Sequence, residues 1–170
     1  YRREESVALK PIAESFLNTY LTSGKYSTKD FATLQETFTQ MEEAADILMI
    51  TSENPALIAE MKPWLMQHKL MGETGQTVLT MLKAYETSDQ ALFLRKYKHA
   101  KALQQQMFNV DQTYNQNPYQ PGVKTAGLVI KPLIDKTFAK VVEMYNQKHG
   151  TTLDAKTDYM PHALTSDVSQ

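Results

Sequence analysis

Hydrophobic side chains recur at alternating steps of three and four residues along most of the chain, which is the spacing of one face of an α-helix. The clearest stretch runs from Ser27 to Ile50, where Ser27 and Asp30 resemble a capping box with Asp in place of the usual Glu. Its apolar positions are Phe31, Leu34, Phe38, Met41, Ala45 and Leu48. They predict one amphipathic helix with all six side chains on its apolar face.

Two further apolar stripes follow one another closely. The first consists of Met71, Gly75, Val78, Leu82 and Tyr85. It ends at Thr87-Ser88, and Ser88 is predicted to cap the next helix. The second stripe consists of Leu92, Phe93, Tyr97, Ala100, Leu103, Met107 and Val110. Because the connection between them is so short, we expect the two helices to pack antiparallel.

Two more helices are predicted, one before and one after these three segments. The first is expected from about Glu4 to Leu21, with Ser23-Gly24 as its end, and the last from about Ala126 to Lys148, with Gly150 as its C-terminal stop. Their apolar positions are Leu9, Ile12, Phe16 and Tyr20 in the first, and Ile130, Ile134, Phe138, Val141 and Tyr145 in the last.

Prolines and glycines mark further boundaries. Pro55 after Asn54 is typical of the first helical residue after a cap. Three prolines that follow a Lys either kink a helix or begin one, namely Pro11, Pro63 and Pro132. Gly72 and Gly75 either allow a close approach to a neighbour or mark a break, and Gly75→Leu is predicted to destabilise the fold by overpacking.

The predicted fold is therefore an all-α bundle of about five helices over residues 1–150. Residues 111–125 contain two prolines and no helical stripe, which predicts a long loop. Residues 151–170 are polar and irregular, with Leu153, Tyr159, Met160 and Leu164 as anchors, and we interpret them as a tail or linker to a following module. The chain begins at Tyr1 without an initiator Met, which suggests that it was cut from a longer protein.

Composition removes several classes of function. Leu, Ala and Met supply 41 residues against 14 for Val plus Ile, which favours helix over sheet. The net charge of -1 argues against obligate binding of nucleic acid or another polyanion. Because the chain has no Cys, it excludes a disulfide scaffold, a thiolate metal site and a Cys nucleophile. No apolar run is long enough to span a membrane.

The titratable residues show no arrangement typical of catalysis or metal binding. The four histidines lack the Glu three positions earlier that a di-iron bundle requires, so no metal or cofactor is predicted at His68, His99, His149 and His162. The pairs Glu4-Glu5 and Glu42-Glu43, with Asp46 one turn on, are interpreted as a solvated acidic face. The chain also lacks a Gly-x-Ser-x-Gly elbow, a Walker loop and a dinucleotide fingerprint, and no catalytic or ligand-binding residue is predicted.

Three groups of residues could contact a partner, although an ordinary structural role is favoured for each. The basic residues Arg95, Lys96, Lys98, His99 and Lys101 scatter around a helix and are expected to be solvated. Trp64 is more typical of packing than of a sugar platform. The predicted loop offers rings and amides for a ligand in Tyr114, Asn115, Asn117 and Tyr119.

Several segments resemble a known domain. They are Pro55 to Leu65, Gly72-Glu73-Thr74-Gly75, Val78 to Leu82, Gly122-Val123 and Val129 to Asp135. This pattern is similar to the helical domain after the catalytic barrel in glycoside hydrolase family 84, the bacterial β-N-acetylglucosaminidases of Bacteroides type related to the animal O-GlcNAcase. The likeness extends from the first helix to about Gly150, and its motifs are packing motifs.

The resemblance implies a parent enzyme that removes terminal β-linked N-acetylglucosamine with retention, the substrate's own acetamido group acting as nucleophile, and that is periplasmic or secreted. In that family two adjacent Asp residues of the barrel carry the chemistry. This chain has no Asp-Asp pair, so no catalytic residue is carried over. We expect a non-catalytic bundle whose partner is the barrel of the same polypeptide, and through it the glycoconjugate. The alternatives are a freestanding helical protein-interaction domain and, less favoured, an enzyme in its own right.

Overall fold

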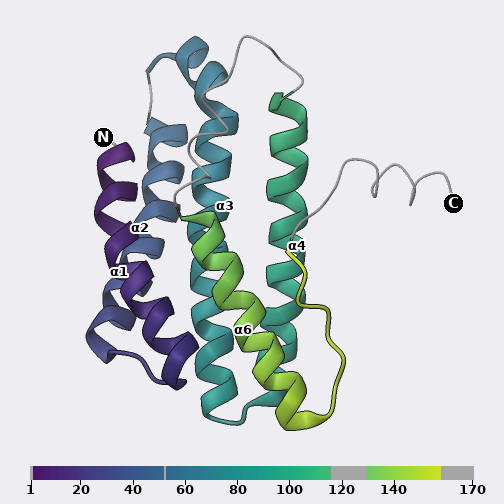
Figure 1. Ribbon diagram of the computed structural model, residues 1–170. Coiled ribbons are helices and arrows are strands. Elements are labelled where there is room, and N and C mark those ends of the chain that lie inside the picture. Colours follow the sequence, from purple (N-terminus) through teal and green to yellow (C-terminus); the bar gives the residue numbers. More distant parts are fainter. Residues whose placement is uncertain (1, 52, 116–129, 158–170) are drawn as a thin grey trace, which may run out of the picture.

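The computed structural model describes residues 2–51, 53–115 and 130–157, which form five α-helices and no strand within those ranges (Figure 1). The helices are α1 (Arg2–Ser23), α2 (Thr28–Thr51), α3 (Pro55–Glu86), α4 (Gln90–Asn115) and α6 (Lys131–His149). The all-α prediction is confirmed, and the five predicted apolar stripes lie on these helices, except that Ile130 is the N-cap of α6.

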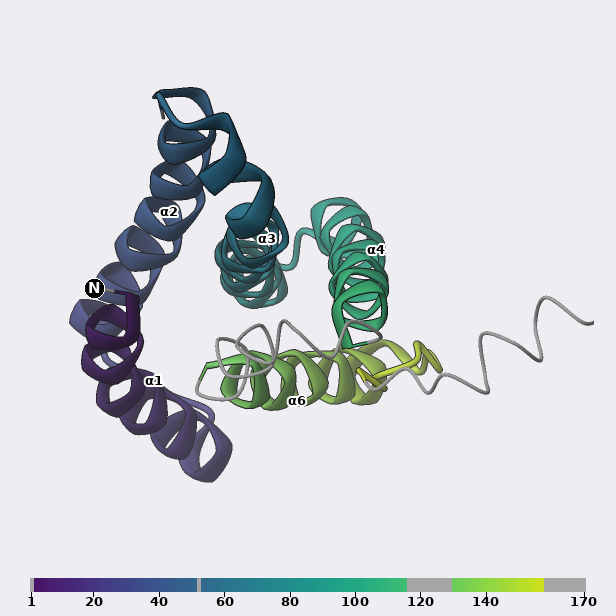
Figure 2. The same cartoon turned by 90° about the horizontal axis from the view of Figure 1, so that it is seen from above.

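The long helix α3 is the centre of the bundle. Seen from above (Figure 2), α2 and α4 flank α3, while α6 crosses its open side and meets α1 at one end. α3 and α4 run antiparallel, as their short connection predicts (Figure 1). The core between the helices contains side chains that are fully removed from solvent, among them Met81, Leu82, Phe93, Phe138 and Val141.

Most predicted helix ends are confirmed by their hydrogen bonds. The Ser27 hydroxyl oxygen accepts from the Asp30 backbone N–H at 3.2 Å, and the Asn54 side chain accepts from the Leu57 N–H at 3.1 Å. Two glycines adopt the left-handed conformation that ends a helix, with φ of 69° at Gly24 and 64° at Gly150.

The cap of α4 is not the predicted one. The Asp89 carboxylate accepts from the Leu92 N–H at 3.1 Å, so Asp89 and not Ser88 is the N-cap. Ser88 instead has a positive φ of 58° in the turn, and its hydroxyl accepts from the Lys148 ammonium at 3.1 Å. The predicted cap was therefore wrong by one residue, because the turn after α3 needs one residue more than the sequence pattern suggested.

The predicted loop from Asp111 was also wrong at its start, since α4 continues to Asn115. A helix does not need an apolar stripe to continue, and the first residue that disfavours helix is Pro118, which acts on the residue before it. Residues 116–125, with Asn117 and Tyr119, lie outside the described residues. So do the predicted anchors Tyr159, Met160 and Leu164 of the tail.

The prolines fall into both of the predicted classes. Pro11 lies inside α1 and Pro63 inside α3, whereas Pro132 lies in the first turn of α6. Because α3 continues through Pro63, the segment that begins at Asn54-Pro55 and the stripe that begins at Met71 belong to one helix of 32 residues. This length lets α3 contact α2, α4 and α6 along different parts of its surface.

The two glycines of α3 mark a close approach and not a break. A methyl group added at Gly72 would lie 2.6 Å from the Phe38 carbonyl oxygen and 3.0 Å from the Glu42 nitrogen, both backbone atoms of α2. A methyl group at Gly75 would lie 2.6 Å from the Phe38 ring. The absence of side chains at these two positions therefore sets the distance between α2 and α3.

The chain after α6 packs against the bundle up to the last described residues. The Asn146 side chain bonds both the N–H and the carbonyl of Leu153, at 3.0 and 2.9 Å. The Tyr97 hydroxyl donates to the Asp154 carbonyl at 2.9 Å, and the Lys101 ammonium donates to the Lys156 carbonyl at 2.6 Å. Residues 151–157 thus lie along α4 and α6 without regular secondary structure, and Leu153 is an anchor as predicted.

Candidate interaction surface

The histidines have structural surroundings. His68 is buried, with its ring parallel to that of Trp64 at 6.1 Å. The His99 Nε2 lies 2.9 Å from a Glu73 carboxylate oxygen on the surface, and the His149 ring lies 4.4 Å from that of Tyr145 at the end of α6. His162 lies outside the described residues. Within the part of the chain that the structure describes, no three His, Asp or Glu residues are grouped as metal ligands.

The basic cluster is dispersed, as predicted. Arg95 and Lys98 are exposed, whereas the Lys101 ammonium is turned toward residues 151–157. His99 faces Glu73 on α3, on another side of α4. These charges do not form one continuous surface, so the structure gives the cluster no common ligand.

The acidic residues of α2 differ from the prediction. Glu42 accepts from the Gln76 amide at 2.8 Å, and Asp46 accepts from the Lys69 ammonium at 2.7 Å, so both contact α3. Only Glu43 of this group is exposed, while Glu42 and Asp46 are half-buried. The interpretation as a solvated acidic face holds for Glu43, whereas Glu42 and Asp46 are only partly solvated because they lie at the edge of the contact that Gly72 brings close. The side chains of Glu4 and Glu5 lie outside the described residues. The hydrogen bond to the Asp46 carboxylate raises the pKa of Lys69.

Trp64 and the loop residues do not form a ligand platform in the described ranges. Trp64 is half-buried and stacks on His68, which agrees with its interpretation as a packing residue. Tyr114 and Asn115 lie in the last turn of α4, and the structure describes their backbone but not their side chains.

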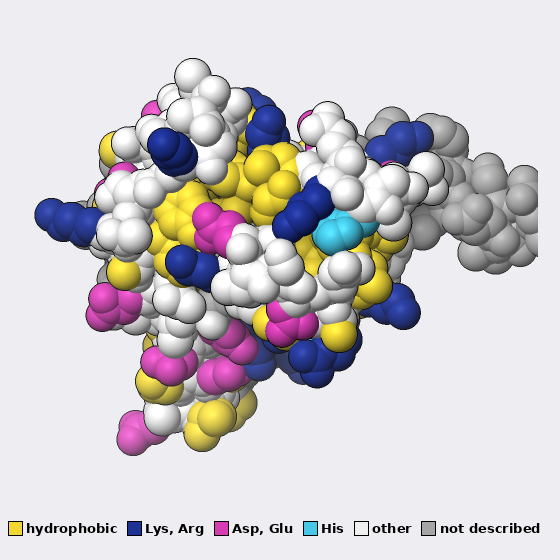
Figure 3. Space-filling view, turned by 90° about the horizontal axis from the view of Figure 1, so that it is seen from below, with side chains coloured by type: hydrophobic (Ala, Val, Ile, Leu, Met, Phe, Trp, Pro, Cys, Tyr) yellow, Lys and Arg dark blue, Asp and Glu magenta, His cyan; other side chains and the backbone are white. Residues whose placement is uncertain are grey.

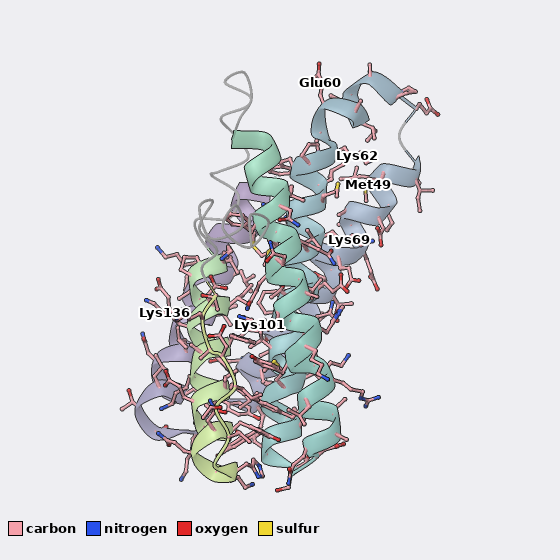
Figure 4. All side chains as sticks on the ribbon, turned by 90° about the vertical axis from the view of Figure 1, so that its right-hand side faces the viewer. Met49, Glu60, Lys62, Lys69, Lys101 and Lys136 are labelled. Carbon is pink, nitrogen blue, oxygen red and sulfur yellow. The ribbon has the colours of Figure 1, made fainter. Side chains whose placement is uncertain are left out.

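A groove between α2, α3 and α4 has a volume of about 540 Å³. Its lining residues are Met49, Lys62, Met66, Lys69, Leu70, Glu73, Gln106, Asn109 and Val110, and we call it the outer groove. In Figure 4, Met49 of α2 and Lys62 and Lys69 of α3 lie close together beside α4. The groove forms because α2 and α4 diverge on either side of α3 (Figure 2).

The floor and the rim of the outer groove differ in chemistry. Its apolar side chains come from all three helices, with Met49, Met66 and Val110 as examples. Toward its lower part Lys69 forms an ion pair with Asp46, and a Glu73 carboxylate oxygen lies 2.9 Å from the His99 Nε2. Lys62 is exposed at the upper part and makes no ion pair with the described residues. Among the described residues, the groove therefore presents an apolar surface with one Lys, Lys62, that makes no ion pair.

The end of the α2–α3 hairpin continues this apolar surface. We call residues 47–51 and 55–62 the arm, which projects beyond the other helices in Figure 2. Ile50 is 82% exposed, and the other exposed large apolar side chains here are Ile47, Leu48 and Leu57, with Met66 beside them in the groove. The predicted apolar stripe of α2 thus ends at Ala45, and Leu48 was wrongly placed in it. From below, the arm at the lower edge of Figure 3 shows hydrophobic side chains among acidic ones.

Apolar side chains that are exposed next to one another mark a surface that other molecules cover. The arm and the outer groove together have this character, with methionines that adapt to irregular neighbours. Sequence reasoning missed the site because Ile50 and Leu57 have the same hydrophobicity as core residues. The arrangement is suited to contact with a folded partner.

The fold agrees with a comparison against known families. The family model described as the post-catalytic domain of bacterial GH84 matches residues 5–138, from α1 into α6. The match includes all the segments on which the resemblance was based, although it ends before Gly150. No helix in the described ranges is long and apolar enough to cross a membrane. The chain therefore belongs to the family of post-catalytic helical domains of bacterial glycoside hydrolase family 84.

Proposed function

We propose that this bundle is the non-catalytic helical domain of a multidomain β-N-acetylglucosaminidase, and that it supports and positions the catalytic barrel. The single observation that carries the proposal is the family match over residues 5–138, because the family is defined by its place after a catalytic domain. The exposed arm and outer groove support it, since a domain that holds another domain needs a surface of this kind.

The chemistry of the whole enzyme then belongs to the barrel. Two adjacent Asp residues there orient the substrate's acetamido group and protonate the leaving oxygen, and terminal β-linked N-acetylglucosamine is released with retention. This departs from the usual scheme with two carboxylates at the scissile bond. The bundle contributes no catalytic residue and needs no metal or cofactor. Export to the periplasm or the outside of the cell is part of the same proposal.

The test uses the complete coding sequence from which the chain derives. We expect it to encode a barrel with an Asp-Asp pair upstream of Tyr1, and the complete protein to hydrolyse an aryl β-N-acetylglucosaminide. The 170-residue chain alone is expected to show no turnover. A start codon directly upstream, or hydrolysis by the bundle alone, would refute the proposal.

A second function, a freestanding helical domain that binds another protein, is favoured by the same apolar groove. The two functions differ in what covers the groove. In the first it is a domain of the same polypeptide, so the complete protein is self-sufficient. In the second a separate protein is required, and the gene contains no barrel.

A further inference from the structure

We propose that the arm and the upper part of the outer groove are the face on which the catalytic domain of the same polypeptide docks. This inference rests on the proposed function and adds which surface makes the contact. The docking face is defined by Met49, Ile50, Lys62, Met66 and Val110.

The arm lacks the packing that makes a helix end stable in water. Between Glu53 and Glu60 no side chain is buried, and Ile58 alone is half-buried. Helical stability in proteins comes mainly from tertiary packing of an apolar face, and among the described helices the ends of α2 and α3 lie beside each other, past the rest (Figure 2). Covering exposed apolar side chains is favourable by about 25 cal/mol for each Å² removed from water. A partner on this face would therefore stabilise the arm.

The position of the arm selects the partner. In a post-catalytic domain the catalytic domain precedes α1, and the start of α1 lies at the same end of the bundle as the arm (Figure 1). A domain joined there reaches the arm without crossing the bundle. The described chain after α6, residues 151–157, lies along α4 and α6, where the Lys101 ammonium donates to the Lys156 carbonyl, and so does not cover the arm.

The chemistry of the face specifies what it meets. Met49, Ile50 and Met66 require apolar side chains opposite them. The Lys69 ammonium pairs with Asp46, whereas Lys62 makes no ion pair with any described residue and so needs a counter-charge from a partner. An unpaired ammonium is costly in a dry interface. The docking surface of the catalytic domain is therefore expected to be apolar, with a carboxylate opposite Lys62.

The absence of Cys from this chain permits a direct test in the complete protein. Ile50→Cys places a thiol at the most exposed apolar position of the docking face, and Leu21→Cys is a matched control near the end of α1. The exposed fractions are 82% for Ile50 and 40% for Leu21, so the bundle alone predicts faster labelling at position 50. Maleimide labelling is followed by peptide mass, so that thiols of other domains do not interfere.

We expect maleimide to label the Ile50→Cys thiol about tenfold more slowly than the Leu21→Cys thiol, because labelling must wait for undocking. Equal or faster labelling at position 50 would overturn the inference. The inference would also be overturned if the Ile50→Cys thiol were protected only while light scattering shows an oligomer and became reactive on dissociation to monomers. A second copy of the chain would then be what covers the face.

A charge reversal gives an independent measurement. Lys62→Glu is expected to increase labelling of the Ile50→Cys thiol in the complete protein, whereas Lys98→Glu on the exposed side of α4 leaves it unchanged. An identical response to both reversals would count against the carboxylate opposite Lys62 and so against this docking face. Failure of the proposed function is distinguishable: a complete protein without a barrel or hydrolysis refutes that function, whereas an active enzyme with rapid labelling at position 50 refutes the docking face alone.

Discussion

The closest contact between α2 and α3 gives the sharpest prediction about stability. Replacing either glycine of α3 by Ala gains about 1 kcal/mol in intrinsic helix propensity. At Gly72 this gain meets the backbone of α2, because the new methyl would lie 2.6 Å from the Phe38 carbonyl oxygen, where ordinary contacts begin at 3.4 Å. α2 would have to move by nearly an ångström, and overpacking of this kind typically costs about 1–3 kcal/mol. We expect Gly72→Ala to lower the free energy of unfolding.

Gly75→Ala should cost less, although its nominal contact is equally short. The methyl would meet the Phe38 ring at 2.6 Å, and that ring borders a small apolar cavity of about 20 Å³ lined also by Ala13, Leu34 and Ile134. The whole Phe38 side chain, including its Cγ, can shift toward such a space through its χ1 angle, whereas a backbone carbonyl cannot. The helix propensity gained then offsets much of the strain. Gly75→Leu adds more volume than the cavity holds, so its predicted overpacking remains.

Urea unfolding, followed by the helical circular dichroism signal, measures these differences, with equal m-values as the sign that the denatured state is unchanged. In a Phe38→Ala background, Gly75→Ala should become neutral or stabilising, because the ring is gone. Gly72→Ala should remain destabilising there, because the backbone contact persists. The reasoning is refuted if Gly72→Ala stabilises the chain, or if Phe38→Ala relieves both substitutions equally.

Three further predictions concern helix ends, the exit segment and alkaline pH. Asp89→Ala should lower the free energy of unfolding by about 0.5–2 kcal/mol, whereas Ser88→Ala, the control without a cap bond, should have a much smaller effect in the same urea titration. Asn146→Ala should free the segment around Leu153 for limited proteolysis while the melting of the helices changes little, and unchanged cleavage would contradict its role. Burial, and then the hydrogen bond to a carboxylate, raises the pKa of Tyr26 above its usual range. The neutral Tyr26 side chain therefore stabilises the fold fully below pH 10, and this contribution is lost as the pH rises further. In an alkaline titration followed by tyrosinate absorbance, Tyr26→Phe should show one fewer tyrosine that ionises late.

The helices could be predicted because their signals are local. The apolar spacing between Phe31 and Ala45, and the caps at Ser27 and Asn54, depend on the backbone of a single helix and on nothing across the bundle. The predicted helix ends were wrong where two residues could both act as a cap, or where the apolar stripe ended before the helix did. Asp89 and Ser88 are both good caps, and the positive φ of Ser88 decided between them. The last turn of α4 has no apolar stripe, yet nothing before Pro118 breaks it.

Contacts between helices could not be predicted in the same way. Glu42 and Asp46 look solvated in sequence, because their partners Gln76 and Lys69 are brought to them only by the pairing of α2 with α3. Gly72 allowed either a break or a close approach, and the choice depends on which helix faces it. Such features require the arrangement of two helices, which periodicity in one of them does not specify.

The docking face could not be predicted from the sequence for the same reason. Ile50 and Phe38 are equally hydrophobic and both lie on α2, yet one is 82% exposed and the other is buried. What separates them is that the last turns of α2 project past the other helices at the arm (Figure 2), whereas Phe38 lies where Gly72 and Gly75 bring α3 close to α2. Exposed apolar residues at the end of α2 stabilise the protein only when another surface covers them. The exposed arm is therefore better explained as half of an interface than as an incomplete core, and accessibility of position 50 in the complete protein decides between these explanations.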